Sequence, residues 1–285
     1  MNAILLAGLL ASSLHAAPDT TLDLRRGDRV VVDRLSGSVV VEAWDRSSVE
    51  VRATDGDTRA LGLSRSGSRV SVVPFDPKGR RLEVDAVLRV PRWVDVEVRG
   101  RSLDVRVSGV EGRVVVDNVS GDIRTEHTSG EVSLSTVEGE IDVRSARGSV
   151  TAHSRGDDVR LSDVTGDVDV ASGDGDLTLD GVTASSLRAE TLDGDVFFRG
   201  PLMHQGRYWF SVHDGDATLA VPRDADAAFS VSTFDGEFTS EFPVTLKGYK
   251  GGGVFEFTLG RGSAQVQVKV FDGEIRLARD RTPGR

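Results

Sequence analysis

Residues 110–181 read VEGRVVVDN VSGDIRTEH TSGEVSLST VEGEIDVRS ARGSVTAHS RGDDVRLSD VTGDVDVAS GDGDLTLDG when they are divided into eight blocks of nine residues. The third position of every block is glycine, except for Asp157 in the sixth block. An acidic residue usually follows, and then an apolar, a variable and an apolar residue. A short segment repeated at a fixed period is typical of a solenoid, in which stacked copies share a core that no single copy could form.

The two apolar positions of each block alternate with polar ones. Counted from glycine, positions +2 and +4 hold pairs such as Val132 with Leu134 and Ile141 with Val143. Alternation with a period of two predicts a strand with one buried face, and β-branched residues suit such a strand. Glycine permits the positive φ that a sharp corner needs. Each block therefore predicts about five residues of strand and about four of turn.

The spacing alone fits a hairpin meander as well as a parallel solenoid. A constant polarity and phase favours the solenoid, because hairpins normally show two alternating turn chemistries. A weaker period lies two residues before glycine, where large and small residues alternate as Val119, Thr128, Val137 and Ala146. This period indicates about eighteen residues per coil, with successive coils ~4.8 Å apart. We therefore expect an all-β parallel β-solenoid (β-helix) of roughly nine-residue strand-turn units, with two strands per coil.

The chain divides into four segments. An apolar run at residues 1–11, followed by Ala16 and Ala17, predicts a cleaved signal peptide over residues 1–17. A buried first strand or a short core helix is the alternative, whereas a membrane anchor would need ~20 apolar residues. We expect a β-rich N-terminal part of the solenoid at 18–109 and regular repeats at 110–200. Residues 201–285, where aromatic residues concentrate, predict wider C-terminal coils and a tail.

Charge and composition narrow the classes of function. The formal net charge is −10, and the longest basic runs are Arg25 with Arg26 and residues 78–81. A nucleic-acid surface normally needs a basic patch, so we expect no nucleic-acid partner. The chain has no cysteine, which excludes disulfides, thiolate metal sites and a cysteine nucleophile. We also expect no stable membrane span after cleavage of the signal peptide.

The repeat motifs resemble those of a known bacterial family. VSGDIRTE, VEGEIDV, VTGDVDV and FDGEIRL, together with VPRDADAAFSVSTFDGEF, are similar to the bacterial putative-adhesin domain, a β-strand-repeat domain of unknown function. The resemblance is close over roughly Val90 to Leu277 and looser over Leu22 to Val90. It implies a β-solenoid in an exported or membrane-associated protein and an adhesive role. It brings no established catalytic residues.

The acidic residue after glycine is a candidate cation ligand. In eighteen-residue coils, one ladder would contain Asp122, Glu140, Asp158 and Asp176. Such a ladder could bind Ca²⁺, which takes several oxygen ligands. Alternatively each acid caps its turn by accepting backbone N–H bonds, with its charge partly offset by Arg124 and Arg160. The Ca²⁺-binding β-roll also has nine-residue units, but here only residues 173–176, GDGD, approach its glycine pattern.

No catalytic or cofactor-binding motif emerges. The sequence has no nucleophile elbow, P-loop or dinucleotide fingerprint. A polysaccharide-active β-helix enzyme is an alternative, but its carboxylates would need a cleft, and no long insertion lies between Gly112 and Gly194. Tyr208, Trp209 and Phe210 could form a sugar-stacking platform; alternation places Trp209 opposite the other two, which favours the core for at least one side.

These observations predict a non-catalytic, exported β-solenoid without cofactor, located in the periplasm or at the cell surface. It would act as an adhesin or as an envelope scaffold, with an envelope protein or a glycan as partner. Flat and rigid faces offer repeated weak contacts, which suit multivalent binding. The alternatives are a polysaccharide-active enzyme and a purely structural envelope protein.

Overall fold

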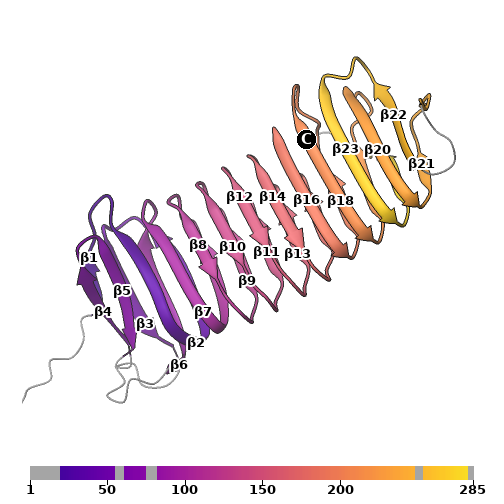
Figure 1. Cartoon of the computed structure of the whole chain (residues 1–285). Coiled ribbons are helices and arrows are strands. Elements are labelled where there is room, and N and C mark those ends of the chain that lie inside the picture. Colours follow the sequence, from indigo (N-terminus) through magenta and orange to yellow (C-terminus); the bar gives the residue numbers. More distant parts are fainter. Residues whose placement is uncertain (1–19, 55–60, 75–81, 248–252, 282–285) are drawn as a thin grey trace, which may run out of the picture.

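A computed structural model of the chain describes residues 20–54, 61–74, 82–247 and 253–281. Within these residues there are 24 strands and no helix, and the strands form one continuous sheet wound into an elongated solenoid (Figure 1). The expected signal peptide, residues 1–17, lies outside the described residues.

Eight short strands carry the regular repeats. Each pairs in parallel with the strands two places away, so that Val132 lies between Val114 and Val150. One coil is therefore eighteen residues with two strands, and the predicted parallel solenoid is confirmed over the hairpin meander. The strands are β8 (Val114–Asp117), β9 (Ile123–Glu126), β10 (Val132–Ser135), β11 (Ile141–Arg144), β12 (Val150–His153), β13 (Val159–Ser162), β14 (Val168–Ser172) and β15 (Leu177–Asp180).

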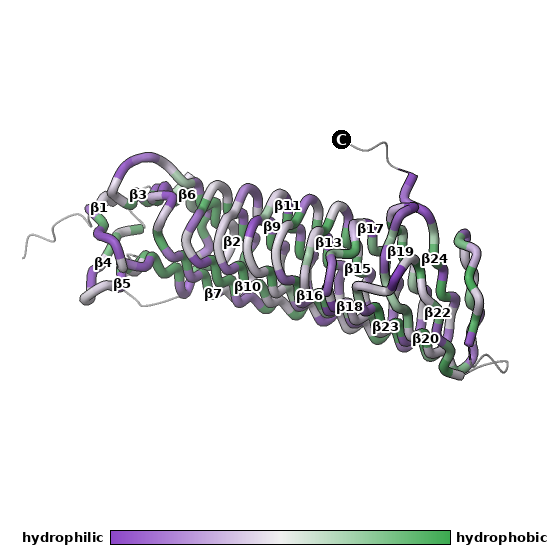
Figure 2. Tube along the Cα trace, turned by 90° about the horizontal axis from the view of Figure 1, so that it is seen from above, coloured by the Kyte–Doolittle hydropathy of each residue, from purple (hydrophilic) through white to green (hydrophobic). Residues whose placement is uncertain are grey.

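The apolar positions of the repeat line the interior between the two sheets. Ile123, Val132 and Ile141 expose at most 1% of their surface, and the alternation of apolar and polar residues follows every coil (Figure 2). The two corners of a coil differ, because Thr128 is buried at one while Val137 is 36% exposed at the other. This difference explains the weak eighteen-residue period, because only every second block places the residue two positions before its glycine in the core.

The N-terminal coils do not follow the order of the chain. The first half of β2 pairs in parallel with β5 and β7, and its second half pairs with β6 and β7. The first coil of the chain, β2, therefore lies between the coil made of β5 and β6 and the coil made of β7. Antiparallel strands complete this end, with β4 on β5, β3 on β6 and β1 on β3. The strands are β1 (Thr21–Asp23), β2 (Arg29–Trp44), β3 (Ser48–Ala53), β4 (Leu61–Ser66), β5 (Arg69–Pro74), β6 (Leu82–Pro91) and β7 (Asp95–Ser108).

The C-terminal coils are wider and show the same inversion. β23 lies between β18 and β20, and β24 lies between β19 and β21. The last coil of the chain is therefore stacked between two coils that precede it in the sequence. The antiparallel strand β22 pairs with β20 at this end (Figure 1). The strands are β16 (Ser186–Asp193), β17 (Val196–Arg199), β18 (Arg207–Asp214), β19 (Ala217–Val221), β20 (Ala227–Asp235), β21 (Phe238–Ser240), β22 (Gly253–Leu259), β23 (Ala264–Asp272) and β24 (Ile275–Arg279).

Aromatic side chains fill the wider interior of these coils. Phe198 packs against Tyr208 and Phe210, with ring centroids 6.0 and 5.4 Å away. The Tyr208 hydroxyl donates to the Ala184 carbonyl at 2.6 Å and accepts from the Met203 N–H at 2.7 Å. Burial raises the pKa of Tyr208, and the bond from Met203 offsets part of that rise. The polar end of Tyr208 is thus satisfied inside an apolar core.

Candidate functional site

The predicted acidic residues form a column along one edge of the solenoid. Asp122 and Asp158 each accept a hydrogen bond through Oδ1 from the N–H of the acidic residue one coil further on, at 3.2 and 2.9 Å. Arg124 donates to Asp122 and Arg160 donates to Asp158. These contacts cap the turns and offset the charge. The column includes all four residues of the predicted ladder, Asp122, Glu140, Asp158 and Asp176.

Cation binding by this ladder stays a prediction. In the described part of the chain, no three side chains of histidine, cysteine, aspartate or glutamate converge closely enough to hold a metal ion. The carboxylates follow one another along the solenoid axis: Asp122, Asp158 and Asp176 each accept a hydrogen bond from a backbone N–H one coil further on, and Glu140 pairs with Arg160.

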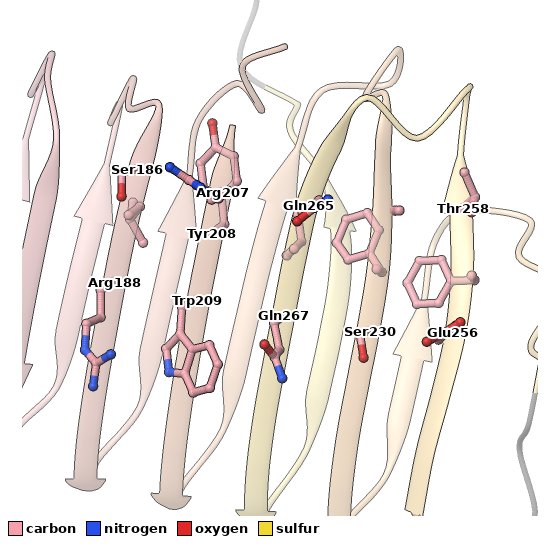
Figure 3. A pocket seen from close by; sticks show the side chains of 15 residues that line it. Ser186, Arg188, Arg207, Tyr208, Trp209, Ser230, Glu256, Thr258, Gln265 and Gln267 are labelled. Carbon is pink, nitrogen blue, oxygen red and sulfur yellow. The ribbon is translucent and has the colours of Figure 1, made fainter. Parts of the chain in front are cut away.

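A more distinctive surface lies on the C-terminal coils, where β16, β18, β23, β20 and β22 run side by side. Because these strands pair in register, outward side chains at matching positions form rows across the sheet. The first row is Ser186, Arg207, Gln265, Ala228 and Thr258. The second row is Arg188, Trp209, Gln267, Ser230 and Glu256 (Figure 3).

Two adjoining hollows occupy this face. The first, of about 610 Å³, is lined by the two rows above. The second, of about 670 Å³, continues along the same strands and is lined by residues that include Glu190, Ser211, Lys269 and Phe271. These volumes are in the range of small-ligand sites.

Trp209 is the centre of the first hollow. It is half-buried, with the Lys269 Nζ 4.6 Å and the Arg188 guanidinium 5.9 Å from its ring centroid. Arg188 also donates to Glu190 at 2.7 Å. The buried indole Nε1 has no hydrogen-bond partner among the described residues. Cations beside a tryptophan ring stabilise it electrostatically and fix its orientation.

Exposed apolar and aromatic side chains form one edge of the second hollow. Leu192, His213, Phe271 and Phe234 occupy the same position on four neighbouring strands, and we call this set the aromatic ridge. The rings of His213 and Phe271 stack with centroids 4.9 Å apart, as do those of Phe271 and Phe234. Leu192, Phe271 and Phe234 are 64%, 48% and 74% exposed. Clustered exposure of this kind marks an interaction surface.

Two columns of acidic residues run beside the aromatic ridge, because each ridge residue begins a motif of the form x-Asp-Gly-acid. The first column is Asp193, Asp214, Asp272 and Asp235. The second column is Asp195, Asp216, Glu274 and Glu237, which continues the ladder of the regular coils.

The sequence placed some of these residues correctly. Tyr208 and Phe210 are buried and Trp209 faces outward, which confirms the expected alternation. The aromatic ridge was missed, because Phe271 reaches its place between His213 and Phe234 only through the inverted order of the coils. The signal that could have found it is the recurrence of aromatic-Asp-Gly-acid at residues 213–216, 234–237 and 271–274.

No described residue belongs to a helix with the length and apolar character that a membrane crossing requires. Solved structures with a similar arrangement include a putative cell adhesion protein from Clostridium sporogenes, with 8% identity and a TM-score of 0.24, covering 91% of this chain and 98% of that one. Another is a putative adhesin from Parabacteroides merdae, with 11% identity and a TM-score of 0.33, covering 90% and 94%.

No curated protein matches the sequence. A family described as Toastrack DUF4097 matches residues 17–162 and 146–278, which together span most of the chain. The match agrees with the resemblance that the repeat motifs carry and with the observed β-solenoid. The chain belongs to the Toastrack DUF4097 family.

Proposed function

We propose that this protein is a non-catalytic, exported binding module, an adhesin or envelope scaffold that holds its partner on the outer face of the C-terminal coils. The observation that carries the proposal is the concentration of binding features on that face: two hollows, the outward Trp209 and the exposed aromatic ridge. Tryptophan, tyrosine and arginine contribute most to binding energy at interfaces, and aromatic residues in general are enriched there. The outward rows of the regular coils consist mostly of small and charged residues, such as Ser133, Thr151 and Asp169.

Three carboxyl groups near the ends of the solenoid have a structural role. Among the described carboxyl groups, the resolved pKa shifts are downward and belong to Asp28, Asp226 and Glu241. Desolvation raises the pKa of Asp226, but hydrogen bonds from the N–H groups of residues 261–263 outweigh it and lower the pKa. These groups are held as anions that fasten turns.

Export is part of the proposal, and its support is the apolar run at residues 1–11 followed by small residues. We infer that residues 1–17 are removed on export and that the solenoid acts in the periplasm or at the cell surface. The acidic net charge of −10 agrees with a partner that is neither nucleic acid nor an anionic membrane.

Photo-crosslinking in the native envelope tests the proposal. A photoreactive amino acid is placed at Gln267, in the first hollow, or at Arg276, which faces outward from the opposite sheet of the same coil. We expect envelope adducts from position 267 but not from position 276, and a mature chain that lacks residues 1–17. Adducts from position 276 alone, adducts from neither position, or an uncleaved chain in the cytoplasm would contradict the proposal.

A further inference from the structure

The aromatic ridge differs from the other exposed apolar residues of the solenoid in its continuity. Val119 and Val137 occupy the equivalent corner of the regular coils, but the next two blocks at that corner have Arg155 and Gly173. In the C-terminal coils, four successive strands contribute an apolar or aromatic side chain without interruption. Burying such a strip against a partner removes apolar surface from water, which favours association.

Among the described residues, the acidic columns beside the aromatic ridge lack the arginine partners that most acids of the regular ladder have, although backbone N–H groups donate to Asp195 and Asp216 and Thr239 donates to Glu274. In the regular coils, Asp122 pairs with Arg124, and Glu140 and Asp158 both pair with Arg160. By contrast, in the described part of the chain none of the eight carboxylates beside the aromatic ridge forms an ion pair with arginine or lysine. The nearby cations of the hollow, Lys269 and Arg188, lie against Trp209.

Apolar and anionic features in parallel define the chemistry of the partner. An anionic membrane or a second copy of the same edge would bring like charges together, which is unfavourable. A neutral glycan would leave the eight carboxylates without counter-charges. A polypeptide that presents apolar side chains in one row and lysine or arginine in the next would bury the ridge and neutralise both columns.

We propose that the aromatic ridge and its two acidic columns are a docking surface for a basic, apolar protein segment. This inference rests on the proposed function and names its partner class. The four strands of the ridge span roughly 15 Å, which an extended segment of about five residues covers. Solvent-exposed charges are screened by salt, so binding weakens as ionic strength rises.

Fluorescence polarisation with three labelled peptides tests this inference on the full chain. The peptides, each about twelve residues long so that they exceed the ridge, alternate lysine with phenylalanine, glutamate with phenylalanine, or lysine with serine. We expect the lysine-phenylalanine peptide to bind at least about tenfold more tightly than the other two. Its affinity should fall between low and physiological salt.

Variants distinguish the surface from non-specific attraction to an acidic protein. F234S/F271S should weaken binding of the lysine-phenylalanine peptide by at least about tenfold. D193N/D214N/D235N/D272N should weaken it and flatten its salt dependence. The matched control V119S/V137S removes apolar side chains from the same corner of the regular coils and should leave binding unchanged. All these side chains reach solvent and at least a third of each of the four apolar ones is exposed, so the variants should fold; circular dichroism and thermal unfolding check this.

The outcomes separate this inference from the proposed function. Equal binding of the glutamate-phenylalanine peptide, or unchanged binding by F234S/F271S, would overturn the docking surface. If envelope adducts still form at position 267 in that case, the binding module stands and its partner has a different chemistry. If neither selective peptide binding nor envelope adducts at position 267 are observed, the proposed function is contradicted as well.

Discussion

Steric constraints require glycine at the corners of the coils, and Gly166 illustrates them. Gly166 has φ of 138°, and a Cβ placed on it would lie 2.0 Å from the backbone oxygen of Gly148 one coil away. Both the left-handed backbone and the close approach of neighbouring coils exclude a side chain. The glycine repeat therefore results from the short distance between coils as well as from the turn conformation.

Alanine at this position should destabilise the solenoid. We expect G166A to lower the free energy of unfolding by about 2 kcal/mol or more, because a strained φ adds to a backbone clash. The matched control is Gly156, where φ is ordinary and a Cβ would lie 3.4 Å from its nearest neighbour, the Val137 carbonyl oxygen. G156A should change the free energy of unfolding by no more than about 0.5 kcal/mol. Chemical denaturation measures both, and equal effects would refute the steric account.

Burial of single residues was predictable because it depends on local alternation. Ile123, Val132 and Ile141 lie in the core, as the period of two indicated. Trp209 faces outward for the same reason. The neighbours of Phe271 were not predictable in this way, because they depend on the insertion of β23 between β18 and β20.

At the scale of the element, the unit of construction is the coil of eighteen residues rather than the block of nine. The two corners of a coil are different: Ala146 and Val164 are buried at one corner, whereas Val119 and Val137 are exposed at the other. Removing one whole coil preserves this distinction, but removing half a coil exchanges the corners for every later strand.

Deletions of the two lengths should therefore have different effects. Deleting residues 132–149 removes one coil, and we expect a folded chain with a modest loss of stability, because each coil contacts only its neighbours. Deleting residues 132–140 would move Arg155 from the exposed corner to the buried corner, where an unpaired charge is strongly unfavourable. We expect that variant to unfold or aggregate. Circular dichroism and size-exclusion chromatography measure the difference, and similar behaviour of the two deletions would argue against distinct corners.

At the scale of the whole molecule, both ends close in the same way. The first coil, β2, lies between β7 and the coil formed by β5 and β6. The last coil, β23 with β24, lies between β18 with β19 and β20 with β21. Antiparallel strands pair at each end, with β4 on β5 and β22 on β20. This arrangement covers strand edges that would otherwise offer unpaired backbone groups to other chains. The sequence predicted wider coils but not their order, because register between distant strands leaves no local pattern.

Truncation tests the consequence of this inversion. A chain that ends at Leu259 lacks β23 and β24, so β20 and β21 lose their parallel neighbours and the antiparallel strand β22 is left on an unsupported β20. We expect hydrogen exchange in residues 227–240 and 253–259 to rise to the level of unstructured chain, while β8 to β15 stay protected. A chain that ends at Arg281 serves as the control. Preserved protection of β20 in the shorter chain would contradict the inserted position of the last coil.

The most direct test of the stacked, in-register coil uses engineered cysteine pairs, since the natural chain has no cysteine. Thr151 and Asp169 lie opposite each other on β12 and β14, eighteen residues apart, whereas Arg160 lies on β13 in the facing sheet. Adjacent strands are about 4.8 Å apart, which suits a disulfide. We predict that T151C/D169C oxidises readily and that T151C/R160C does not. Ready oxidation of T151C/R160C, with T151C/D169C remaining reduced, would mean that neighbouring blocks pair as hairpins and would contradict the parallel solenoid.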